Sequence, residues 1–67
     1  MEYIKDSTGR TIGTIAMDGN KLVARSETGR GLGFYDPSSD ETRDWDSHSF
    51  LAKGNILSAL IWRAAGM

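Results

Sequence analysis

The chain lacks several features on which small proteins rely for stability. Its 67 residues include no cysteine and a single histidine. Disulfides and thiolate metal sites are therefore excluded, and a histidine-rich zinc site within one chain is not expected. A domain of this size buries only roughly 60% of the surface that its unfolded chain exposes, so its core alone is marginal. We therefore expect a second subunit, as in a homodimer, or another protein as partner.

An excess of positive charge and long apolar runs are also missing. Eight Lys and Arg stand against nine Asp and Glu, which leaves a formal net charge of −1. General nucleic-acid binding needs a concentrated basic surface, so nucleic acid is not the expected partner. No apolar run approaches the ~20 residues of a membrane span, and the start at Met1 has neither a basic nor an apolar signal region. We expect a soluble cytoplasmic protein that does not bind membranes.

What the chain does contain is a repeat of 20 residues. Asp6-Ser-Thr-Gly-Arg-Thr-Ile-Gly13 aligns without a gap with Ser26-Glu-Thr-Gly-Arg-Gly-Leu-Gly33, and a degraded third copy starts at Asp46. Each copy indicates two strands joined by an x-x-Gly-Arg turn, in which Gly9 or Gly29 supplies the positive φ. The side chains that open these two turns can accept hydrogen bonds from turn amides.

The repeat rows are themselves joined by turns. Asp18-Gly19-Asn20 is a hairpin signal, and the stretch from 36 to 40 is a longer loop in which Pro37 presets a turn. Strands of about five residues leave no room for the crossovers of a dozen or more residues that parallel strands require. The pattern predicts one domain over residues 1–67, an antiparallel meander of five or six short strands with rows at 2–21, 22–41 and 42–54.

The end of the chain changes to a helical period. Apolar residues recur at helical spacing over 55–65, where Asn55 can cap a helix and Gly66 can end it. The sequence thus predicts a mainly β fold of the α+β type, with one C-terminal helix packed on the sheet. Trp62 falls almost opposite the main apolar stripe. Either it lies on the domain's own sheet because the helix is rotated, or the helix has a partner interface. That predicted interface consists of Trp62, Ala65, Ala59 and Met67.

The repeated Asp-x-x-Gly-Arg-x-x-Gly element resembles the hairpin repeats of YD (Rhs-type) proteins. It is also similar to the repeats of a loose group of small bacterial and prophage proteins. Lys5 stands where a YD tyrosine would precede the aspartate, and Ser26 replaces the aspartate in the second row. The resemblance implies a β-hairpin building block with a structural role and no catalytic residue. The matching residues are Asp6, Gly9, Arg10, Gly13, Gly29, Arg30 and Gly33.

Two pairs of cations occupy equivalent positions in the first two rows. Two of them lie in the turns, and two precede the turns. A strip of such cations could bind an anionic ligand, a phosphate backbone or an acidic protein surface. The alternative is that the arginines cover the turns and pair with Asp6 and Glu27. The predicted anion-binding residues are Lys5, Arg10, Arg25 and Arg30.

The stretch that follows is acidic. Asp44, Asp46 and His48 alternate, so an extended strand would place all three on one face, where they could hold a divalent cation. The alternative is a solvated, charged edge that opposes aggregation of the sheet. Ser47 and Ser49 would point to the face opposite His48, and no nucleophile elbow is present. We therefore predict neither an enzyme nor a cofactor.

These patterns favour a non-enzymatic protein-interaction or assembly module that acts through the apolar C-terminal helix. The resemblance adds the expectation of a phage or prophage accessory protein. Two alternatives remain open at this point: a binder of an anionic ligand or nucleic acid through the basic strip, and a small domain that binds a divalent metal through the acidic stretch.

Overall fold

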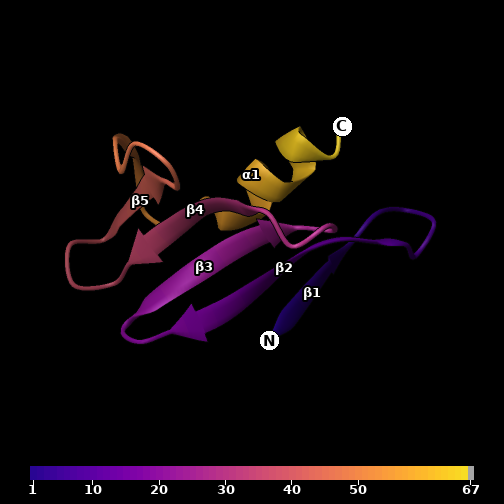
Figure 1. Cartoon of the computed structure of the whole chain (residues 1–67), viewed down its shortest axis with the longest axis horizontal. Coiled ribbons are helices and arrows are strands. Elements are labelled where there is room, and N and C mark those ends of the chain that lie inside the picture. Colours follow the sequence, from indigo (N-terminus) through magenta and orange to yellow (C-terminus); the bar gives the residue numbers. More distant parts are fainter. Residues whose placement is uncertain (67) are drawn as a thin grey trace.

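The computed structural model describes residues 1–66, in which six strands are followed by one helix. All neighbouring strands are antiparallel, and their order in the sheet is their order in the chain. The helix lies across one face of this sheet (Figure 1). The predicted fold is thereby confirmed. The elements are β1 (Glu2–Lys5), β2 (Thr11–Asp18), β3 (Lys21–Ser26), β4 (Gly31–Asp36), β5 (Glu41–Asp44), β6 (Phe50–Lys53) and α1 (Leu57–Ala64).

The two x-x-Gly-Arg turns have the same geometry. Gly9 and Gly29 have φ of 86° and 87°, the positive values that the sequence predicted. The Asp6 side chain accepts hydrogen bonds from the N–H groups of Thr8 and Arg10. Ser26 acts in the same way in the second turn, where its hydroxyl accepts the N–H of Arg30 at 3.2 Å. Short-range hydrogen bonding therefore builds both turns.

The third copy of the turn begins two residues earlier than the sequence alignment placed it. Asp44, rather than Asp46, takes the first position: its N–H donates to the carbonyl of Ser49 at 2.9 Å, and its carboxylate accepts the N–H of Ser47 at 3.1 Å. His48, with φ of 58°, takes the place of the turn glycine. The sequence concealed this turn because the third copy is one residue longer and has lost Gly-Arg.

Each of the three repeat hairpins contains a β-bulge. The register shifts leave Ile12, Leu32 and Leu51 without a cross-strand partner. A bulge interrupts the alternation of side chains between the two faces. For this reason Ile12 and Ile15, three residues apart, both reach the core.

The core lies between α1 and the middle of the sheet, strands β2 to β4. The helix approaches so closely that the strands beneath it need glycine. A Cβ on Gly13 would lie 2.5 Å from Ile61 Cγ2, and one on Gly33 would lie 2.6 Å from Leu60 Cδ1. Strands β1 and β6 remain as the edges of the sheet. The buried apolar cluster consists of Ile12, Ile15, Ala24, Leu57 and Ile61.

Thr42 connects the sheet to the start of the helix. Its side chain is fully buried; its hydroxyl donates to the carbonyl of Gly54 at 2.6 Å and accepts the N–H of Ile56 at 3.2 Å. The helix spans Leu57–Ala64 and is shorter than the predicted 55–65. Ile56, and not the predicted Asn55, is the N-cap residue; Asn55 lies just before it, and its Oδ1 accepts the N–H of Leu57 at 3.0 Å.

Candidate functional site

The residues of the predicted helix interface that the structure describes, Trp62, Ala59 and Ala65, do not form a large apolar surface. Trp62 is half-buried and packs against the chain's own core, as expected for a rotated helix. Ala59 and Ala65 are exposed but present only methyl groups. Met67 lies outside the described residues. The exposed part of α1 therefore offers a partner little apolar area.

The four predicted anion-binding cations are divided between two places. Lys5 and Arg25 lie on strands, whereas Arg10 and Arg30 lie in the turns. Arg10 donates from Nη2 to both carboxylate oxygens of Glu27, at 2.7 and 2.6 Å, and this bond raises the pKa of the Arg10 guanidinium. The predicted pairing with Glu27 thus holds for Arg10, and a single basic strip is not formed.

A surface depression of about 240 Å³ lies between the second turn and the end of α1. It brings together Arg30 and Ala65, which the sequence had assigned to different sites. Several of its polar groups already have partners: Glu27 bonds Arg10, which lies outside the lining, and the hydroxyls of Ser26 and Thr28 bond each other at 2.8 Å. The depression therefore offers few free polar groups to a ligand. Its lining is Ile12, Ser26, Glu27, Thr28, Arg30, Leu32, Ala64 and Ala65.

The predicted metal ligands do not share a strand, so the premise of that site is wrong. Strand β5 ends at Asp44, and a turn separates this residue from His48. The backbone N–H of Ser47 bonds the Asp44 carboxylate and lowers its pKa. The His48 ring packs edge-on against Phe34, with 5.4 Å between centroids. Within residues 1–66, no three His, Cys, Asp or Glu side chains are placed to hold a metal ion.

The face of the sheet opposite α1, named the open face here, carries aromatic and basic side chains. Its positions follow from the strand register, because residues paired across two strands share a face, whereas successive residues along one strand lie on opposite faces. Three rows cross the strands on this face. The first is Tyr3, Thr14, Arg25 and Gly31, the second Ala16, Val23, Phe34, Arg43 and Phe50, and the third Asp18, Lys21, Asp36, Glu41 and Lys53.

Cations lie against the aromatic rings of the open face. The Arg25 guanidinium lies 5.3 Å from the centroid of the Trp45 ring, and the Lys21 ammonium 4.9 Å from that of Phe34. Trp45 also packs on Gly31, where a side chain would collide with its ring. Cation–π attraction of this kind holds charged groups over apolar surface. The result is a second small apolar layer, covered by cations rather than by a helix.

Charge is distributed unequally between the open face and the rest of the molecule. Five of the eight Lys and Arg lie on the open face with three of the nine acids, so the net charge of −1 divides into +2 there and −3 elsewhere. The open-face cations are Lys5, Lys21, Arg25, Arg43 and Lys53, and its acids are Asp18, Asp36 and Glu41.

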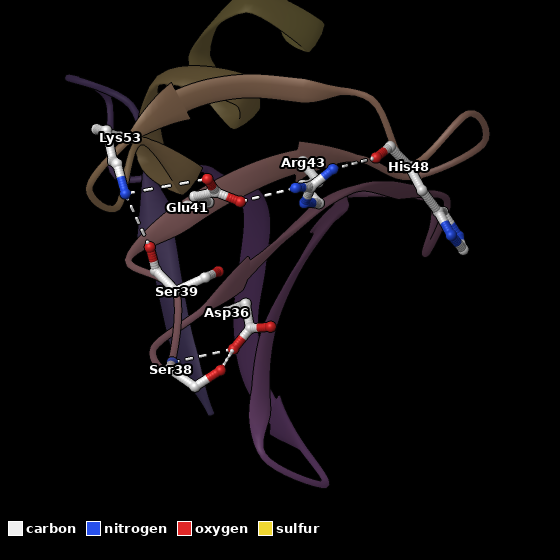
Figure 2. A network of polar contacts seen from close by, with 7 residues as sticks. All are labelled: Asp36, Ser38, Ser39, Glu41, Arg43, His48 and Lys53. Atoms are coloured by element: carbon white, nitrogen blue, oxygen red, sulfur yellow. Dashed lines mark hydrogen bonds and ion pairs between the residues drawn. The ribbon is translucent and has the colours of Figure 1, made fainter.

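Two of these cations neutralise one of the acids at β5, as Figure 2 shows. Arg43 donates to Glu41 at 2.7 Å and to the carbonyl of His48 at 3.0 Å. The Lys53 ammonium lies 3.9 Å from the other Glu41 oxygen and donates to the carbonyl of Ser39 at 3.1 Å. Arg43 is thereby fixed on the open face and Glu41 is compensated there.

Sequence reasoning singled out Lys5 and Arg25 but missed Trp45 as the neighbour of Arg25. Alternation could have indicated part of this face, because Tyr3 alternates with Lys5 along one strand. Trp45 lies in the turn whose start the alignment misplaced, so no periodic signal marked it.

Comparisons with known proteins assign no family to the chain. No protein-family model matches it, and neither a curated protein nor a solved structure does. In residues 1–66, no helix has the length and apolar character needed to cross a membrane.

Proposed function

We propose that the chain is a cytoplasmic, non-enzymatic interaction module that associates with a second copy of itself through β1. The observation that carries this proposal is where large apolar side chains stay exposed. Met1, Tyr3 and Met17 are 79%, 60% and 64% exposed and lie on or beside β1. The other two, Phe50 and Leu51, lie on β6, the opposite edge. Sheet edges with exposed apolar side chains favour association with another chain.

Strand β1 also offers backbone hydrogen bonds to a partner. The N–H of Asp6 donates to the carbonyl of Arg10, and its carbonyl accepts the N–H of Gly9, so both groups point toward the β2 side. Successive residues of an edge strand direct these groups to opposite sides. The N–H and C=O groups of Tyr3 and Lys5 therefore point outward from the sheet.

A second copy suits this edge because β1 can pair antiparallel with itself about a twofold axis. Such an isologous contact uses the same donors and acceptors on both sides. In one register Tyr3 lies opposite the partner's Lys5, which places an ammonium group beside an aromatic ring. Ile4, which packs against the core, then lies beside the partner's Ile4 on the helix face. In this homodimer the two sheets form one continuous sheet, and both helices lie on the same face of that sheet.

The test is the mass in solution at several protein concentrations, with a pair of variants at one position. Lys5→Pro removes an N–H that the sheet does not use, whereas Lys5→Gln removes only the charge. We expect a dimer for the wild type and Lys5→Gln, and a folded monomer for Lys5→Pro. A wild type that stays monomeric at millimolar concentration would overturn the proposal.

A double variant, Ala59→Asp with Ala65→Asp, separates this edge from the interface that the sequence predicted on the helix. The edge proposal expects an unchanged dimer, because both alanines are exposed and belong to the helix segment, which packs on β2 to β4. If this variant alone dissociates, the helix is the interface and β1 is not. A phage or prophage origin has its support in the repeat resemblance.

A further inference from the structure

We infer that the open face binds single-stranded nucleic acid. The inference shares Tyr3 and Lys5 with the proposed β1 edge, but pairing of that edge would place two open faces side by side and would leave both residues on the open face. It rests on the separation of charge between the faces, on the position of the acids, and on the exposed rings of Tyr3 and Phe50 among the cations.

The separation of charge removes the objection that the composition raised. The open face carries a net charge of +2, although the whole chain carries −1. A phosphate at this face is screened from distant charges, because the Debye length is about 8 Å at physiological ionic strength and the helix layer lies about 10 Å behind the sheet. It therefore responds mainly to the cations beside it.

The acids of the open face leave most of it free for a polyanion. All three lie in the last row, next to the turns at 19–20 and 37–40, and Glu41 is already compensated by Arg43 and Lys53. The first two rows contain Arg25 and Arg43 and no acid. Lys5 extends this basic region along β1.

The aromatic rings are placed for stacking on bases. Tyr3 is 60% exposed in the same row as Arg25, and Trp45 covers the end of that row on β4. Neighbouring strands lie about 4.8 Å apart, so Tyr3 on β1 and the Trp45 site on β4 are separated by about 14 Å. Phe50, 51% exposed on β6, adds an exposed ring in the second row, opposite Arg43. Cations beside exposed rings are the arrangement in which one strand can stack its bases and pair its phosphates.

This combination distinguishes the ligand from other candidates. Bases must be unpaired to stack, and this flat face offers no helix or ribbon to enter the groove of a duplex. A neutral sugar would use the rings but not the cations, and an acidic protein would use the cations but not the rings. Single-stranded nucleic acid uses both.

Fluorescence anisotropy with a labelled oligothymidylate decamer tests the inference over a range of salt concentrations. We expect a plot of the logarithm of the association constant against the logarithm of the salt concentration to have a slope of about −2. The three cations of the basic region, Lys5, Arg25 and Arg43, contribute about 0.7 each. Arg25→Gln should make this slope shallower by about 0.7, whereas Arg25→Lys should leave the slope unchanged. Tyr3→Ser should weaken binding about tenfold without changing the slope, because it removes stacking and no charge.

A matched control lies off the open face. Arg63→Gln removes a cation from the helix and should bind like the wild type. The inference is overturned if the decamer does not bind, if binding is independent of salt, or if Arg63→Gln weakens it as much as Arg25→Gln. Equal binding of heparin together with an unchanged Tyr3→Ser would show a polyanion surface without base stacking and would also overturn it.

Discussion

Replacement of Thr42 by valine removes a hydroxyl and leaves the shape of the side chain nearly unchanged. In the wild type this buried hydroxyl donates to the carbonyl of Gly54 at 2.6 Å and accepts the N–H of Ile56 at 3.2 Å. These two bonds hold the segment that leads into α1 against β5. Valine would leave both backbone groups without these partners at the point where the helix docks.

The magnitude follows from the two groups that lose their partner. A buried donor or acceptor left unsatisfied costs about 1–3 kcal/mol. Gly54 and Ile56 are only half-buried, so the lower part of this range applies and the sum is about 2–3 kcal/mol. At ~0.05–0.15 kcal/mol per residue, the whole domain is stable by about 3–10 kcal/mol. A loss of this size should lower Tm by about 8–24 °C, at ~4–8 °C per kcal/mol for a small domain.

The assay is thermal unfolding followed by circular dichroism at one fixed protein concentration, since association raises Tm by mass action. Thr42→Ser is the matched control: it keeps the hydroxyl and loses one buried methyl, at a cost of about 1 kcal/mol. We expect Tm to decrease from the wild type to Thr42→Ser and further to Thr42→Val. A Thr42→Val protein that melts at or above Thr42→Ser would show that these hydrogen bonds do not anchor the helix.

Two further predictions concern packing and pH. Gly33→Ala places a methyl group 2.6 Å from Leu60 Cδ1 and 2.8 Å from the Arg43 carbonyl oxygen; since backbone cannot yield, we expect a loss of about 1–3 kcal/mol by urea unfolding. Gly9→Ala meets no atom within 4 Å and should cost only the strain of its positive φ, about 1 kcal/mol, so a larger loss at Gly9 than at Gly33 would contradict this reasoning. Acid should destabilise the protein through three turn carboxylates, whose pKa values are lowered from 3.8 by hydrogen bonds from Thr8, Ser38 and Ser47. Because the folded pKa lies below the unfolded one, their stabilisation is complete above about pH 4 and is lost as pH falls through the folded pKa. Tm measured between pH 7 and 2 should therefore fall below about pH 4, and less steeply when the three aspartates are replaced by asparagine; an equally steep fall would argue against them. They are Asp6, Asp36 and Asp44.

The part of the fold that sequence reasoning predicted is the part made by short-range interactions. The turn that starts at Asp6 and the one that starts at Ser26 each close within five residues, with a glycine at positive φ and a side-chain acceptor at the first position. Their residue types are therefore sufficient to identify them. Antiparallel order followed as well, because the connections are too short for any other arrangement.

The third turn escaped prediction for the opposite reason. Its glycine position is held by His48, whose φ of 58° is one that residue type alone does not indicate. Because of that error, the segment was predicted as an extended strand although it turns, and Asp44, Asp46 and His48 were predicted to share one strand face. A positive φ at a residue other than glycine depends on surroundings, here the edge-on packing of the His48 ring against Phe34.

By itself, the sequence determined the hairpin repeat, the antiparallel meander and the presence of a C-terminal helix, because periodicity and turn residues act over a few positions. Only the tertiary structure decided which way the helix faces and where the charges gather. Trp62 turns toward the core because the helix lies directly on Gly13 and Gly33. Arg25 and Trp45 meet because a bulge and a turn set the register between strands. Contacts between residues far apart in the chain fix these positions, and a pattern read along the chain does not contain them.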